Sequence, residues 1–133
     1  KYGMVLPSFV KAAIENKALI IHGDGSQTRC FIHVSDVILA LLQAISIEEI
    51  SGEIFNIGNP EEISILDLAK QVISIMNSSS ELKFESHDSV YPEGFEDMTR
   101  RVPNVSKAKS LLNWQPSKSL PAIIRDTSDF YAK

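Results

Sequence analysis

One segment restricts the possible folds of this chain more than any other: residues 34–45 are predicted to form a helix that is apolar on almost every side. Ser35 is a good N-cap, so the helix is expected to open near it. A helix that is hydrophobic nearly all round has to be covered on more than one side. The apolar residues of this segment are Val34, Val37, Ile38, Leu39, Ala40, Leu41, Leu42, Ala44 and Ile45.

The rest of the chain alternates helical and extended patterns, which indicates an α/β fold. Helices are also predicted over residues 7–15 and 65–76, in a short segment after Asn104 and in a last segment after Ser119. Strands are predicted over residues 18–22, 53–57 and 82–84. About five helices then face three short strands, which cannot cover so many apolar surfaces. We therefore expect part of the fold to lie outside this chain.

Polar residues with capping ability mark several of the helix starts. Ser64 with Asp67 three positions on has the form of a capping box, in which both side chains satisfy free N–H groups. Asn104 and Ser119 are predicted to cap the last two helices.

Size and charge exclude several classes of protein. With 133 residues the chain is long enough for a single domain. Its net charge of −4 argues against nucleic-acid binding, because a phosphate-binding surface is normally basic. The longest apolar run, residues 37–42, is too short to span a membrane. The single cysteine, Cys30, and the absence of an export signal lead us to expect a cytoplasmic protein.

The segment Gly23 to Arg29, GDGSQTR, follows a predicted strand and is the strongest candidate for ligand binding. Asp24 and Gly25 tolerate the positive φ of a tight turn. The polar run then ends in one permanent cation, Arg29. This arrangement predicts a turn that presents polar groups and a guanidinium to an anionic small molecule.

A second candidate region runs from His87 to Pro103, where no periodicity is detectable. It contains the acidic residues Glu93, Glu96 and Asp97 and then Arg100 and Arg101. A loop of this length in a compact domain is usually functional or mobile.

Five motifs in the same order resemble the C-terminal part of the NAD-dependent nucleotide-sugar epimerases and dehydratases. These enzymes are extended short-chain dehydrogenases, and they include UDP-glucose 4-epimerase, dTDP-glucose 4,6-dehydratase and UDP-glucuronate decarboxylase. The resemblance covers essentially the whole chain, residues 1–133. The motifs are MVLP at residues 4–7, GDGSQTR at 23–29, HVSD at 33–36, FNIGNP at 55–60, and Arg101 followed by Pro103 and Trp114.

The resemblance implies a binding site for a nucleotide-diphosphate sugar. Arg29 and Arg101 would clamp the pyrophosphate from two sides, and Asn56 would line the same cleft. The first motif and the strand before GDGSQTR would hold the base and ribose, largely through backbone groups. The implied substrate-binding residues are Met4, Val5, Leu6, Pro7, Ile20, Ile21, His22, Gln27, Arg29, Asn56 and Arg101.

Three of these residues, Arg29, Arg101 and Asn56, also have a structural alternative. Arg29 can be an ordinary surface arginine, and Arg101 can form a salt bridge to Glu96 or Asp97. Asn56 can cap a turn or bond to backbone.

The three histidines and Cys30 lack the spacing of a metal site, so we expect no bound metal.

The residues that perform the family's chemistry do not occur in this sequence. No G-x-x-G-x-x-G loop for NAD and no Tyr-x-x-x-Lys pair is present. The resemblance implies that both lie in an N-terminal Rossmann half, which the helix over residues 34–45 contacts and the strand over residues 53–57 extends. We therefore expect a truncated enzyme without catalytic residues. Alone, it would be inactive, bind no NAD and self-associate through its exposed apolar surface.

Three hypotheses follow. The first is the substrate-binding portion of such an enzyme, with UDP preferred over dTDP because GDGSQTR is most similar to the decarboxylase branch. The second is a non-catalytic nucleotide-sugar binding or regulatory module. The third is a scaffold domain in which Arg29 and Arg101 do not contact a ligand.

Overall fold

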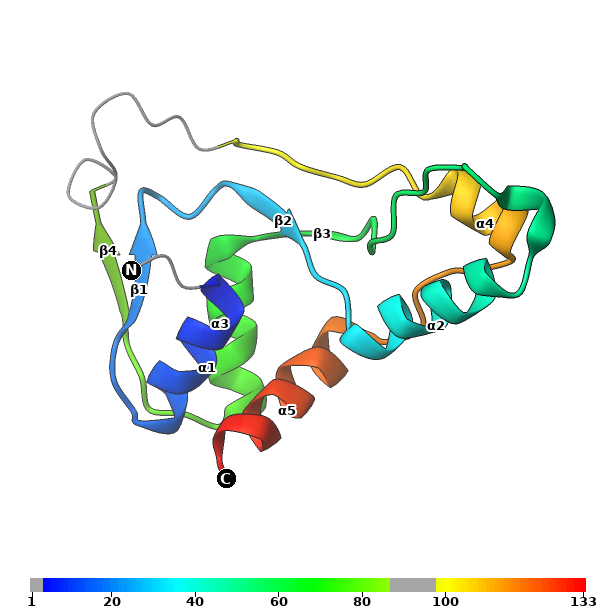
Figure 1. Ribbon diagram of the computed structural model, residues 1–133. Helices are drawn as coiled ribbons and strands as arrows, with labels where there is room; N and C mark the ends of the chain where they lie inside the picture. Colours follow the sequence, from blue (N-terminus) through cyan, green and yellow to red (C-terminus); the bar gives the residue numbers. More distant parts are fainter. Residues whose placement is uncertain (1–3, 87–97) are drawn as a thin grey trace.

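The computed structural model of the chain describes residues 4–86 and 98–133. In this part, five α-helices and four short strands confirm the α/β class, with one more strand than we expected (Figure 1). The helices are α1 (Val5–Ile14), α2 (Val34–Ile45), α3 (Ile65–Met76), α4 (Ser106–Leu112) and α5 (Leu120–Tyr131), with a single 3-10 turn at Glu48–Ile50. The strands are β1 (Leu19–His22), β2 (Thr28–Cys30), β3 (Glu62–Ser64) and β4 (Leu82–Glu85).

The larger of two hydrophobic cores lies between the parallel pair β1–β4 and the helices α1, α3 and α5. Leu19 pairs with Leu82 and His22 with Glu85 along this two-stranded sheet. Alternate residues of β1 are buried, and the helices contribute apolar residues at helical spacing. The fully buried side chains of this core include Val10, Leu19, Ile21, Leu68, Val72 and Ile124.

A second, smaller core joins α2 and α4 at the other end of an elongated molecule (Figure 1). It is formed by Ala40, Ala108, Leu112 and Trp114. Between the two cores run the antiparallel pair β2–β3 and the extended segment that leads into α4. The middle of the molecule is therefore built from segments that are distant in sequence.

Several helix starts differ in detail from the prediction. Helix α1 begins at Val5 instead of Pro7, so Pro7 lies in the first turn, where a missing N–H is tolerated. The N-cap of α2 is His33, whose Nδ1 accepts a hydrogen bond from the Ser35 N–H at 3.1 Å. A ring nitrogen performs the capping that we assigned to the Ser35 hydroxyl.

The remaining capping predictions have mixed outcomes. Half of the predicted capping box is observed: Ser64 Oγ accepts from the Asp67 N–H at 3.0 Å, whereas the Asp67 carboxylate accepts from the Ser64 hydroxyl at 2.8 Å instead of from a backbone N–H. Asn104 Oδ1 accepts from the Ser106 N–H at 3.0 Å at the start of α4. Ser119 occupies the N-cap position of α5 without a capping hydrogen bond from its side chain.

The prediction of a strand over residues 53–57 is wrong, and two other strands were not predicted. Residues 53–57 form no strand, and Ile54 is 83% exposed. A strand requires a hydrogen-bonding neighbour, and no described segment lies in register with this one. β2 and β3 are three residues each and too short for a periodicity to be detected.

Helix α2 buries the face that carries its small side chains and exposes the face that carries its large apolar side chains. Asp36 and Ala40 are buried, and they face the second core. The opposite side is open in the described part of the molecule, with exposed fractions between 51% and 82% along one stripe. This stripe, called the α2 apolar face below, consists of Val34, Ile38, Leu41, Leu42 and Ile45.

Candidate functional site

The Gly23–Gly25 turn connects two strands that belong to different sheets, so it is not the turn of a hairpin. Gly23 and Gly25 have φ of 74° and 75°, which glycine adopts without strain. A Cβ on Gly25 would lie 2.9 Å from Ile21 Cγ2 and 3.0 Å from Leu66 Cβ. Gly25 is therefore required by tight packing against the start of α3, whatever ligand the turn binds.

The polar side chains of GDGSQTR make internal contacts that shape this segment. Asp24 Oδ1 accepts from the Ser26 N–H at 2.9 Å. Gln27 Nε2 donates to the His22 carbonyl at 3.1 Å and so ties the loop to the end of β1. Thr28 Oγ1 donates to Glu62 Oε2 at 2.9 Å across the β2–β3 pair. The segment is held in one shape before any ligand is considered.

Arg29 lies in β2, opposite Ile63, and is half-buried. Its Nη1 donates to two carbonyl oxygens, those of Thr28 and Met98, both at 2.7 Å. The second bond links residues 69 positions apart in sequence. Arg29 therefore contacts the segment that carries the other candidate arginine.

Residues 98–101 run beside β2. The Thr28 N–H donates to the Thr99 carbonyl at 3.0 Å, on the edge of β2 that does not pair with β3. Together with the Arg29–Met98 bond, this contact places the chain of Arg100 and Arg101 against the strand of Arg29. The two candidate regions for anion binding, GDGSQTR and the segment of Arg100 and Arg101, are thus adjacent in the structure.

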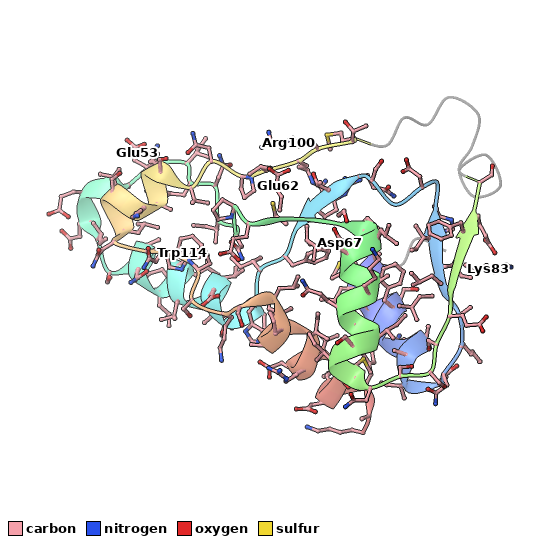
Figure 2. All side chains as sticks on the ribbon, turned by 180° about the vertical axis from the view of Figure 1, so that it is seen from behind. Glu53, Glu62, Asp67, Lys83, Arg100 and Trp114 are labelled. Carbon is pink, nitrogen blue, oxygen red and sulfur yellow. The ribbon has the colours of Figure 1, made fainter. Side chains whose placement is uncertain are left out.

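Arg100 is held by Glu62 of β3, a residue that belongs to none of the sequence motifs. Arg100 Nη2 lies 2.6 Å from Glu62 Oε1, and Arg100 Nε lies 3.2 Å and 3.1 Å from the two carboxylate oxygens. Figure 2 shows the two side chains together where the segment passes β3. No sequence signal marks this pair, because the partners are 38 residues apart.

Arg101 is exposed, and none of the described residues forms a hydrogen bond or ion pair with its guanidinium. The alternative partners Glu96 and Asp97 lie outside the described residues, as do His87 and Glu93. Arg100 and Arg101 are therefore neighbours with different surroundings, one paired with a carboxylate and one exposed.

Asn56 makes the backbone contact that was its structural alternative. Its Nδ2 donates to the Asn104 carbonyl at 3.4 Å, and the residue is exposed. Gly58, two residues on, packs so closely against Pro103 that an added Cβ would lie 2.7 Å from Pro103 Cγ. The FNIGNP segment thus supports the segment that follows Arg101.

The residues implied for the base and ribose lie at the start of α1 and at the end of β1. Ile21 and Leu6 are buried in the main core, so their side chains do not face a ligand. Met4 is 77% exposed, while Val5, Pro7, Ile20 and His22 are half-buried. Figure 1 shows the end of β1, β2 and the segment beside it along the upper edge of the molecule, with the start of α1 below the connection between β1 and β2.

The electrostatic surroundings of the β2–β3 pair follow from these contacts. Hydrogen bonds from Arg100 and then from Thr28 lower the pKa of Glu62. Burial, followed by the charge of Glu62, raises the pKa of the Cys30 thiol, whereas the charges of Arg100 and Arg101 act in the opposite direction. Both arginines therefore lie within electrostatic range of Cys30.

A hollow of about 630 Å³ lies on another part of the surface, where β3, the start of α3 and the start of α5 meet. Its lining includes Glu61, Glu62, Asp67 and Lys70. Apart from Glu62, none of the residues discussed above for nucleotide binding contributes to it. The hollow and the candidate binding residues are thus separate features that share one carboxylate.

Two further motifs prove structural. The Asp36 carboxylate is 1% exposed and accepts from Ser117 Oγ at 2.7 Å and from the Ser117 and Lys118 N–H groups at 3.1 Å. Trp114 Nε1 donates to the Asp36 carbonyl at 2.9 Å, beside α2 (Figure 2). HVSD and Trp114 thus fix α2 to the chain between α4 and α5.

Burial by itself raises the pKa of Asp36. The hydrogen bonds from Ser117 and Lys118, with the charge of His33, outweigh burial and leave the pKa below its ordinary value.

In residues 4–86 and 98–133 no helix is long and apolar enough to cross a membrane. The same residues contain no group of three or more His, Cys, Asp or Glu side chains that could hold a metal ion.

Residues 3–127 match the protein family described as GDP-mannose 4,6 dehydratase. Among curated proteins, the chain is 37% identical to a UDP-N-acetyl-alpha-D-glucosaminuronate decarboxylase of Bacillus cytotoxicus, over 98% of this chain and 40% of that protein. It is 36% identical to UDP-glucuronic acid decarboxylase 1 of Danio rerio, over 98% of this chain and 29% of that protein.

Solved structures of nucleotide-sugar enzymes have the same fold over this region. UDP-glucuronic acid 4-epimerase from Bacillus cereus, in complex with UDP-glucuronic acid and NAD, superposes with a TM-score of 0.82 at 31% identity, over 97% of this chain and 40% of that one. UDP-glucose 4-epimerase from Thermotoga maritima, with UDP-glucose, gives 0.85 at 26% identity, over 98% and 40%. The chain spans 40% or less of the length of each of these relatives.

Proposed function

The chain belongs to the GDP-mannose 4,6 dehydratase family, and we propose that it is the nucleotide-sugar-binding portion of an NAD-dependent epimerase, dehydratase or decarboxylase. Residues 1–133 would form the C-terminal region of that enzyme. They would hold the nucleotide diphosphate, while a Rossmann half outside this chain performs redox chemistry at C4 of the sugar.

The observation that carries this proposal is the contact between β2 and residues 98–101. Through the Thr28–Thr99 and Arg29–Met98 hydrogen bonds, two arginine-bearing segments lie side by side. A diphosphate placed over them would be within reach of both Arg29 and Arg101. A clamp formed from two distant parts of the sequence needs this proximity.

The chemistry of a pyrophosphate suits guanidinium groups. Each phosphate offers paired oxygens that a planar guanidinium can bridge with two parallel hydrogen bonds. Such charge-assisted bonds contribute roughly 1.5 to 3 kcal/mol each. With a net charge of −4 on the chain, anion binding depends on local arginines such as these.

We propose a UDP-sugar as the substrate. Both curated relatives described above are named as decarboxylases of UDP-sugars, and both epimerase structures contain a UDP-sugar. A dTDP-sugar is the alternative that a binding experiment has to separate.

NAD would be bound by the half of the enzyme outside this chain. The glycine turn at Gly23–Gly25 leads into β2 instead of a helix N-terminus, so it does not form the usual cradle for a dinucleotide phosphate. When bound in the other half, NAD would supply hydride transfer at the sugar. The residues of this chain would bind and orient the diphosphate. A cytoplasmic location is part of the same proposal.

The same half of the enzyme would cover the α2 apolar face. Five bulky side chains of α2 are exposed along one stripe, and Ile54 is 83% exposed in a segment that pairs with no strand among the described residues. Exposed apolar surface of this kind marks an interface. A sheet in the missing half would cover the helix and offer residues 53–57 a strand to pair with.

The test is calorimetric titration of the intact protein with UDP, UDP-glucuronic acid and dTDP. We expect Arg29→Ala and Arg101→Ala each to weaken UDP binding by about tenfold or more, the effect of losing one charge-assisted hydrogen bond. Arg125→Ala, which removes an exposed arginine of α5, is the matched control. Unchanged affinity in both variants would favour the scaffold hypothesis.

The upstream coding sequence provides a second test. An enzyme has to encode the glycine loop and the Tyr-x-x-x-Lys pair ahead of residue 1. A reading frame that lacks both, in a protein that still binds UDP through Arg29 and Arg101, would identify a non-catalytic binding module.

A further inference from the structure

Arg100 and Arg101 are consecutive residues, yet only Arg100 has a carboxylate partner among the residues that the structure describes. We propose that the Glu62–Arg100 pair is a latch that positions Arg101 for the diphosphate, so that Arg100 acts through its neighbour and does not contact the ligand. This inference rests on the proposed function, because it assigns a role within the same binding site.

The two faces of the β2–β3 pair carry different side chains. Glu62 and Cys30 are paired in register, so they share one face of the β2–β3 pair, and Arg29 points to the opposite face. After the bend at Thr99, residues 100–103 run extended toward α4 (Figure 1), and successive side chains of an extended chain point to opposite sides. With Arg100 fixed toward Glu62, Arg101 is directed to the face of Arg29.

The latch joins three segments of the chain through one carboxylate, that of Glu62. Arg100 contacts both carboxylate oxygens of Glu62 through two of its nitrogens, at distances of 2.6 to 3.2 Å. Glu62 Oε2 also accepts from Thr28 Oγ1 at 2.9 Å. One carboxylate thus joins β2, β3 and the segment before Arg101. An exposed ion pair has an appreciable effect mainly when it is bidentate and part of a network, and both conditions hold here.

The charges of Arg100 and Arg101 have different surroundings among the described residues. Glu62 compensates the charge of Arg100, and the hydrogen bonds from Arg100 and Thr28 keep Glu62 ionised by lowering its pKa. Among the described residues, no acidic group is paired with Arg101. The latch therefore leaves Arg101 as the cation of this dipeptide that can interact with a phosphate.

The binding test is a double-mutant cycle on the intact protein, titrated with UDP. We expect Arg100→Ala to weaken binding about three- to tenfold when Arg101 is present, and to cause no further loss in the Arg101→Ala background. Glu62→Gln should behave in the same way, and the exchanged pair Glu62→Arg with Arg100→Glu should recover part of the affinity. Glu81→Gln, at an exposed glutamate beside β4, is the matched control.

The thiol of Cys30 reports on the latch without any nucleotide. Its pKa depends on burial and on the charges of Glu62, Arg100 and Arg101. Arg100→Ala should therefore move the pH profile of Cys30 alkylation to higher pH, and Glu62→Gln should move it to lower pH. Mass spectrometry of the Cys30 peptide measures both. Loosened packing would change both variants in the same direction, so opposite shifts identify the electrostatic latch.

The outcomes separate this inference from the proposed function. If Arg29→Ala and Arg101→Ala both leave UDP affinity unchanged, the proposed function fails, whatever the thiol shows. If only Arg101→Ala leaves it unchanged, the latch is refuted, because Arg101 then does not bind the diphosphate. If Arg101→Ala weakens binding and Arg100→Ala does not, the latch is refuted and the function stands. If Arg100→Ala weakens binding equally in both backgrounds, Arg100 contacts the ligand itself or acts by a general loss of structure, and the positioning role is refuted.

Discussion

Replacing Asp36 tests whether the HVSD motif stabilises the fold through one buried carboxylate. The carboxylate is 1% exposed and accepts three hydrogen bonds, from Ser117 Oγ, Ser117 N–H and Lys118 N–H. Among the described residues, Asp36 is the one charged side chain that is this deeply buried. Its carboxylate joins α2 to the chain just before α5.

The magnitude follows from the number and type of these bonds. Hydrogen bonds to a charged group contribute roughly 1.5 to 3 kcal/mol each, and the desolvation of the carboxylate offsets several kcal/mol of their sum. Asp36→Ala removes all three bonds and leaves two backbone N–H groups without their acceptor. We expect it to lower the free energy of unfolding by about 3 to 5 kcal/mol.

Asp36→Asn separates charge from shape. The amide oxygen can accept from the two N–H groups, and the amide nitrogen can donate to the Ser117 hydroxyl, so all three contacts are retained without charge. Because charge-assisted bonds are about twice as strong as neutral ones, we expect a smaller loss of about 1 to 2 kcal/mol. Asp129→Ala, at an exposed position of α5, should change stability by less than about 0.5 kcal/mol.

The assay is urea unfolding followed by the fluorescence of Trp114, the single tryptophan of the chain, which bonds to the Asp36 carbonyl. The pKa of Asp36 is lowered in the folded state, so its contribution is present above the unfolded pKa of about 3.9 and is lost as the pH falls through the folded pKa. The difference between wild type and Asp36→Asn should therefore shrink below about pH 4. A loss of less than about 1 kcal/mol for Asp36→Ala at pH 7 would refute the reasoning.

Three further predictions use other parts of the structure. Gly25→Ala should lower the free energy of unfolding by about 2 to 5 kcal/mol, because it combines a strained positive φ with a Cβ 2.9 Å from Ile21. Gly52→Ala, also at positive φ but with no atom within 4 Å, should cost only about 1 to 2 kcal/mol, and similar losses for both variants in urea unfolding would contradict the packing argument. The pKa of Glu62 is lowered in the folded state, so the stabilising effect of its pair with Arg100 should be lost as the pH falls through that lowered pKa, and the thermal stabilities of wild type and Glu62→Gln should converge in acid. The 133-residue chain should self-associate through the α2 apolar face, and Ile38→Glu with Leu42→Glu should reduce its mass in light scattering; a strictly monomeric wild type at high concentration would contradict this.

The helices could be predicted because their signals are local. Apolar residues three and four positions apart mark α1, α3 and α5 within the segment itself, and the Ser64–Asp67 capping box identifies the start of α3. The errors at helix starts are of one or two residues. The start of α2 was misjudged because a histidine ring nitrogen took the capping role, which residue preferences do not anticipate.

The strands of the candidate site could not be predicted because a strand depends on a neighbour that is distant in sequence. Residues 53–57 are rich in residues that favour strands but have no described segment to pair with, whereas β2 and β3 are three residues each and form a pair. The same limit applied to the site. The motifs indicate Arg29 and Arg101 as candidate binding residues. They do not indicate Glu62, because only the fold brings it to Arg100.

By itself, the sequence determined the α/β class, the positions of the helices, the excess of apolar surface on α2 and the family to which the chain is similar. Only the tertiary structure decided which motif residues hold the fold and which stay exposed: Asp36 and Trp114 are structural, Arg100 is paired and Arg101 is exposed. The physical reason is that a helix is stabilised largely by contacts within a few residues, whereas the surroundings of a charged side chain are set by residues that only folding brings near.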